Sequence, residues 1–189
     1  MSTALHFHER AVFLRESSGS TNLEKTLLKA LKVLGLFEIP HFVCGGFAVQ
    51  EHGYPRFTVD VDLIVPDVAL AREKLSMNGF QENPGSSMTI TDRETKVEVD
   101  LLPGGGKVDS GPLTLPMPTV VSVEPRFLAL EKLLSSKLST YMARGIQRAQ
   151  DYADVAKLMS VNQLPRDFGV EPAVRELYQQ LWDELNRAR

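Results

Sequence analysis

Two aspartates, Asp60 and Asp62, occupy alternate positions in FTVDVDLIV (57–65), a segment that otherwise has the composition of a buried β-strand. Residues two apart in a strand face the same side, about 6.6 Å apart along the chain. Carboxylates are rarely buried, because an unpaired charge inside a protein costs much free energy. We therefore expect a cation against these side chains, and a core on the opposite face formed by Val59, Val61 and Leu63.

A second segment, KVEVDLL (96–102), repeats the alternation and places Glu98 and Asp100 on one face. If the two strands lie side by side, two or three carboxylates converge. Such oxygen ligands suit Mg²⁺, and two ions about 3.5–4 Å apart would activate an attacking hydroxyl and stabilise a leaving pyrophosphate. We predict Asp60, Asp62 and Asp100 as metal ligands and Glu98 as an exposed or structural neighbour. The alternative is the solvated face of an edge strand; Ile64 on the same face and the recurrence at Asp100 argue against it.

A glycine pair, Gly45-Gly46, stands between the short apolar run HFVC (41–44) and a predicted short helix (47–53). Glycine lets the backbone approach a ligand closely, and the free N–H groups at a helix start favour phosphate. The pair alone is typical of a plain turn. Its position 14 residues before the aspartate pair favours phosphate binding.

The pattern of Gly-Gly, Asp-x-Asp on the next strand and a third Asp on a later strand resembles the nucleotidyltransferase superfamily with the DNA polymerase β-type core. The fuller pattern GGFAV…RFTVDVDLIV…VEVDLL…LEKLLSSKL…RAQDYADVAKL is similar to the small nucleotidyltransferases of the AbiEii/AbiGii toxin type. It spans residues 42–158. The resemblance implies a toxin of a toxin–antitoxin pair, with an antitoxin protein as partner.

The resemblance also implies roles for individual residues. The three carboxylates that hold two Mg²⁺ ions in the family, and are also catalytic, map onto Asp60, Asp62 and Asp100. The nucleotide-binding positions map onto Gly45, Gly46, Arg56, Lys137, Arg148 and Asp151. Gln150 stands where the family commonly has a lysine, which puts one phosphate or acceptor contact in doubt. Read without the family, Arg56 and Lys137 are equally suited to salt bridges, and Asp151 and Asp154 to anchoring a helix on the core.

The sequence patterns around these residues predict an α+β fold, with a mixed sheet flanked by helices. Helices are predicted over 22–37 and 67–79, a hairpin over 87–103 with its turn at 92–94, and short strands at 113–115 and 119–123. Three helices without intervening strands follow, over 126–143, 147–160 and 172–188. We predict a nucleotidyltransferase core over 1–122 and a helical segment packed on it over 123–189.

Composition limits the class of protein. The 189 residues carry a net charge of −3, which does not suggest high-affinity nonspecific binding to nucleic acid. Cys44 is the only cysteine, which excludes an intrachain disulfide and a multi-cysteine metal site. We expect no secretory signal, no membrane span and a cytoplasmic location.

The predicted function is Mg²⁺-dependent transfer of NMP from an NTP to a hydroxyl, with release of pyrophosphate. The acceptor stays open between tRNA or another RNA end, a protein side chain and a small molecule. The alternative is a noncatalytic module on the same fold that holds a nucleotide or a partner protein.

Overall fold

The computed structural model describes residues 21–187 of the chain. Its elements follow in the order α2 (Asn22–Leu36), β1 (Phe42–Val43), α3 (Gly45–Glu51), β2 (Asp60–Val65), α4 (Val68–Met77), β3 (Phe80–Glu82), β4 (Thr89–Asp92), β5 (Glu98–Pro103), α5 (Leu130–Arg144), η1 (Gly145–Arg148), α6 (Ala149–Val161), η2 (Pro172–Val174) and α7 (Arg175–Asn186). No helix within residues 21–187 is long and apolar enough to cross a membrane. The prediction about a secretory signal concerns the first twenty residues, which lie outside the described part.

A five-stranded mixed sheet has the order β1-β2-β5-β4-β3. The two central strands, β2 and β5, run parallel, and the outer pairs are antiparallel. In the central pair Asp62 lies opposite Asp100, and Asp60 lies opposite Glu98. This register confirms that the two carboxylate-bearing strands are neighbours.

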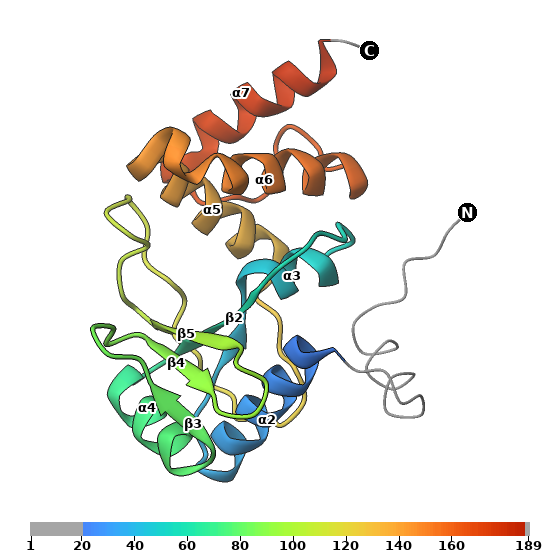
Figure 1. The fold of residues 1–189 in the computed structure, drawn as a ribbon. Helices are drawn as coiled ribbons and strands as arrows, with labels where there is room; N and C mark the ends of the chain where they lie inside the picture. The colour runs from blue at the N-terminus through green and yellow to red at the C-terminus, as the bar shows by residue number, and fades with distance from the viewer. Residues whose placement is uncertain (1–20, 188–189) are drawn as a thin grey trace.

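One face of the sheet packs on α2 and α4, which lie in the lower part of Figure 1, at the end away from α7. The N-terminus of α2 is fixed by a capping box, in which Thr21 and Glu24 each bind the other's backbone N–H. Leucines at helical spacing in α2 then meet Val61 and Leu63 from β2 in a core without solvent exposure. Val59 does not share this core: the strand begins at Asp60, and the Val59 side chain is 66% exposed.

The other face of the sheet carries the carboxylates and packs on α3 and the C-terminal helices. In Figure 1, α3 lies above β2, with α5, α6 and α7 stacked beyond it. A second core joins these helices to Ile64 of β2 and contains the fully buried Tyr178. The carboxylate side chains of β2 and β5 therefore lie between the sheet and these helices.

Several predicted elements differ in extent. Residues 113–115 and 119–123 are not strands; only an isolated bridge between Lys107 and Thr114 forms there. Residues 126–128 run along β1 instead of opening a helix, since the Val43 N–H donates to the Arg126 carbonyl at 2.7 Å. As a result α5 begins only at Leu130. The division of the chain after residue 122 stays a prediction.

Candidate metal and nucleotide site

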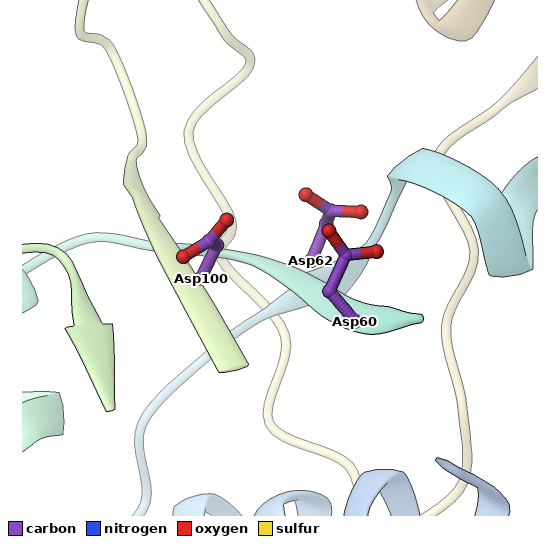
Figure 2. A group of neighbouring side chains, drawn as sticks. All are labelled: Asp60, Asp62 and Asp100. Carbon is purple, nitrogen blue, oxygen red and sulfur yellow. The ribbon is translucent and has the colours of Figure 1, made fainter. Parts of the chain in front are cut away.

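Three carboxylates meet on the central strands. Asp60 and Asp62 come from β2 and Asp100 from β5, and one oxygen of each lies within 4.8 Å of the others. Figure 2 shows the three side chains rising from the two adjacent strands toward the same space. All three are half-buried. Glu98 is exposed, accepts a hydrogen bond from Asn83 Nδ2 at 3.0 Å and is not part of this group.

Each carboxylate of this triad is anchored by a neighbouring donor. Thr58 Oγ1 donates to Asp60 Oδ1 at 2.9 Å, and Thr89 Oγ1 donates to Asp100 Oδ1 at 2.7 Å. The backbone N–H of Gly46 donates to the Asp62 carboxylate. Sequence reasoning missed both threonines. Thr58 could have been found from its position two residues before Asp60, whereas Thr89 depends on the pairing of β4 with β5.

The triad concentrates negative charge. Burial, followed by the charges of Asp60 and Asp100, raises the pKa of Asp62 to about 6, against the opposing effects of Lys137 and the Gly46 N–H. A carboxyl in this position gains from a neighbouring cation. Three oxygen donors at this spacing fit one or two Mg²⁺ ions, whose preferred ligands are carboxylates.

Mg²⁺ binding is expected to weaken as the pH falls through about 6. The ion requires the ionised form of Asp62, and this carboxyl becomes protonated below its pKa of about 6. Between pH 7.5 and pH 5 the affinity should fall roughly tenfold from this group alone. Calorimetric titration with MgCl₂ at several pH values in this range measures the affinity. An Mg²⁺ affinity that does not change with pH would contradict the assignment of Asp62 as a ligand.

The glycine pair packs directly against the triad. Gly45 has φ +56, and a Cβ added to it would lie 1.7 Å from Asp62 Oδ2. A Cβ on Gly46 would lie 2.4 Å from Thr58 Oγ1. Glycine is thus required here for close approach of the turn to the side chains of Asp62 and Thr58, a role that the sequence did not indicate. Phosphate binding by the pair stays a prediction.

Gly45→Ala is expected to displace the Asp62 side chain and lower Mg²⁺ affinity by roughly tenfold or more. The added methyl group clashes with the carboxylate, and a positive φ adds strain of about 1–2 kcal/mol. Gly145→Ala is the matched control, because Gly145 has φ +55 and no described atom within 4 Å of its added Cβ. Calorimetry with MgCl₂ should therefore separate the two variants, although thermal unfolding shows strain in both. Equal Mg²⁺ affinity in the two variants would contradict the steric role of Gly45.

A network of ion pairs lies beside the triad. Lys137 Nζ, on α5, lies 2.8 Å from Asp151 Oδ1 and 2.8 Å from Asp154 Oδ2, both on α6. Arg56 Nε, in the loop before β2, lies 3.1 Å from Asp154 Oδ1, and Arg148 Nε lies 2.7 Å from Asp151 Oδ2. The network therefore ties the loop before β2 to both helices.

The members of this network differ in their access to a ligand. Lys137 has only 7% of its side chain exposed and is held between two carboxylates, whereas Arg148 is 50% exposed. Gln150 donates to Asp154 Oδ1 at 2.8 Å and so joins the network as a neutral member. Three cations face two carboxylates, which leaves one positive charge beside the acidic triad.

All nine residues predicted for the site line one cavity of about 420 Å³. The triad forms one part of its wall, the ion-pair network another, and the loop over 56–59 a third. Phe57 lies at this cavity and is 83% exposed. The structure thus brings the predicted residues together; their roles toward a nucleotide stay predictions.

No protein-family model matches the chain, and no curated protein sequence does. Solved structures do resemble it. The crystal structure of ANT(2'')-Ia in complex with adenylyl-2''-tobramycin matches over 86% of this chain and 99% of that one, with a TM-score of 0.51 and 13% identity. An antigenic nucleotidyltransferase-like protein from Paracoccidioides brasiliensis matches over 89% and 88%, with a TM-score of 0.52 and 17% identity. The mixed sheet with its flanking helices is the α+β fold of these proteins, which confirms the predicted fold class.

Proposed function

We propose that the protein is an Mg²⁺-dependent nucleotidyltransferase, which moves NMP from an NTP to a hydroxyl and releases pyrophosphate. The observation that carries this proposal is the convergence of Asp60, Asp62 and Asp100 within 4.8 Å of one another beside a cavity that also carries cations. The fold supports it, because the structures with this α+β arrangement include an adenylyl-bearing complex.

The three carboxylates would hold the metal, with two ions accommodated by the six oxygens of the triad. Bound Mg²⁺ supplies neutralisation of phosphate charge and lowers the pKa of an attacking hydroxyl. Two observations support the fit of Mg²⁺ to this site. The three donors are carboxylate oxygens, and the raised pKa of Asp62 shows that the cations of the protein do not fully balance the negative charge of the triad.

The chain's own residues then orient the reactants. Asp100, with one oxygen fixed by Thr89, would accept the proton of the acceptor hydroxyl on its other oxygen. Arg148, half exposed at the cavity, would contact the triphosphate directly. Lys137 and Arg56, both paired with carboxylates, would contribute a positive field and hold the cavity wall in place.

The finer assignment is a toxin of the AbiEii/AbiGii type with an antitoxin partner. It is supported by the sequence pattern alone. The acceptor class is a separate question, and ANT(2'')-Ia offers one precedent, since its complex contains the adenylylated small molecule tobramycin. These acceptor classes can be separated by experiment: the transferred nucleotide would be found on a small molecule, on an RNA end or on a protein side chain.

The experiment incubates the protein with Mg²⁺, each α-labelled NTP in turn and a cell extract, and separates RNA, protein and small molecules. The Asp60→Ala/Asp62→Ala variant is the control. Label that depends on both aspartates supports transfer, and its fraction identifies the acceptor class. If no NTP gives label and calorimetry shows metal-dependent NTP binding, the chain is a noncatalytic nucleotide-binding module, as in the alternative prediction. Absence of both label and binding contradicts the proposal.

A further inference from the structure

A second cavity, of about 260 Å³, adjoins the triad. It does not reach Asp60, and the residues that it shares with the larger cavity are Gly45, Asp62, Asp100, Lys137, Arg148 and Asp151. Instead it extends to Leu102, two residues beyond Asp100 on the same face of β5. Because β2 and β5 run parallel, the two cavities follow one another along the strands, with Asp62 and Asp100 between them.

The wall of this second cavity has an apolar part that the larger cavity lacks. It is formed from β5, the loop over 104–116, the segment before α5 and α5 itself, and its apolar members are Leu102, Val108, Leu115, Leu128 and Leu133. Cys44 adds a thiol whose pKa burial raises well above its ordinary value, so the group stays neutral. A wall of this kind binds hydrocarbon.

The polar side chains that line only the second cavity are already paired within the protein. Asp109 forms an ion pair with Arg144 at 2.5 Å. The hydroxyls of Ser136 and Thr140 donate to carbonyls of their own helix, at 2.9 Å and 3.0 Å. A sugar or base placed here would exchange its water contacts for few protein partners, which is unfavourable.

The chemistry of phosphoryl transfer assigns different roles to the two cavities. The attacking and leaving oxygens lie roughly in line on opposite sides of the phosphorus. Lys137 and Arg148 line both cavities, whereas Arg56 lines only the larger one. The additional cation there suits the triphosphate, so we place the departing pyrophosphate on that side. The attacking hydroxyl must then come from the side of Leu102.

Resting on the proposed nucleotidyltransferase function, we infer that the acceptor is a small molecule with a hydroxyl at the end of an apolar body. Its hydrocarbon part packs on Leu102, Leu115 and Leu133, and its hydroxyl lies at Asp100. The hydroxyl oxygen forms the bond to the α-phosphorus, and the bond from that phosphorus to the oxygen bridging the β-phosphorus breaks. Pyrophosphate leaves with the bonding electrons, and the hydroxyl proton passes to Asp100.

The test uses straight-chain 1-alkanols as probes, with glycerol and an RNA oligonucleotide bearing a free 3′-hydroxyl as comparison acceptors. Mass spectrometry detects the alkyl ester of NMP. Each buried methylene should raise the apparent kcat/KM about fourfold until the cavity is filled. Glycerol, which has the hydroxyl without the hydrocarbon, should react far more slowly than the longer alkanols.

A blocking variant separates this cavity from the nucleotide cavity. Leu102→Phe should abolish the chain-length dependence and alkanol binding, measured by saturation-transfer NMR, while calorimetric binding of an α,β-methylene NTP analogue with Mg²⁺ stays unchanged. Leu70→Phe is the matched control, because Leu70 lies on α4 at the opposite face of the sheet and is 40% exposed.

Three outcomes would overturn the inference. Equal rates for glycerol and the alkanols, or RNA labelling that Leu102→Phe leaves unchanged, would do so and leave the proposed function standing. Failure of the wild-type protein to bind the analogue would overturn the proposed function as well.

Discussion

Replacing Asp62 with Asn is expected to abolish nucleotide transfer and, in the absence of metal, to stabilise the folded protein. Activity should fall by roughly a thousandfold or more, because the amide has lost the charge that holds the metal. Stability should rise because burial and two neighbouring carboxylates disfavour the ionised form of Asp62, whose pKa is about 6 in the fold. The gain at pH 7.5 is about 1–3 kcal/mol.

The pH dependence of this gain has a definite sign. The pKa of Asp62 is raised from 3.8 to about 6 on folding, so the fold favours the protonated carboxyl. The wild-type protein therefore loses stability from this group as the pH rises from about 4 to about 6, and the loss is complete above that range. The advantage of Asp62→Asn should accordingly be largest at neutral pH and vanish near pH 4.

Chemical denaturation in the presence of a chelator measures the gain at several pH values. Glu98→Gln is the control, since Glu98 is an exposed carboxylate on the neighbouring strand and lies outside the triad. It should change neither stability nor activity appreciably. An Asp62→Asn protein that is less stable than wild type at pH 7.5 would show that the triad is not under electrostatic strain.

The carboxylate triad was predictable because its geometry follows from short-range rules. Side chains alternate between the two faces of a strand, so Asp60 and Asp62 had to share a face. The repeated pattern indicated that the strand bearing Asp100 lies beside them. The parallel pairing of β2 and β5 could not be derived from the pattern alone. The edge strand β3, with three residues too short to give a periodic signal, was not identified from the sequence either.

The errors in the sequence analysis have a physical cause. Residues 113–115 and 119–123 have β-forming composition, but they form irregular loops. No neighbouring strand hydrogen-bonds to them, apart from one isolated bridge at Thr114. The start of α5 was placed four residues early, since the backbone of residues 126–128 pairs with the edge of β1. The presence or absence of a long-range pairing partner outweighs local propensity in both cases.

The carboxylates that pair with the cations also could not be identified from the sequence alone. Lys137, Asp151 and Asp154 stand at spacings typical of helices, which suggests a common face for the two aspartates. The contact of Arg56 with Asp154 requires the loop before β2 to meet α6, and only the packing of the helices on the sheet shows this. Arg56 and Lys137 both form the salt bridges of the alternative interpretation. Their contact with phosphate stays a prediction.

Lys137→Met is expected to destabilise the fold by about 3–5 kcal/mol, one of the largest losses available to a single substitution in this chain. Lys137 is 7% exposed, and its ammonium lies 2.8 Å from both Asp151 and Asp154, which are themselves buried. Methionine fills a similar volume but leaves two buried carboxylates with less compensation. The free energy of unfolding in urea measures this loss.

Two further variants distinguish the loss of charge from the loss of packing. Adding Asp154→Asn to Lys137→Met should recover part of the stability, because it removes one of the two buried charges that lost the lysine while keeping the acceptor of the Gln150 hydrogen bond. Arg148→Met should cost less than about 1 kcal/mol, since Arg148 is half exposed although it contacts the same Asp151. If Lys137→Met and Arg148→Met were equally mild, the network would not hold α5 and α6 together, and Lys137 would be free to serve the nucleotide instead. A large loss that Asp154→Asn partly reverses would show that the lysine is first a structural cation, whose field reaches Asp62 from a fixed position.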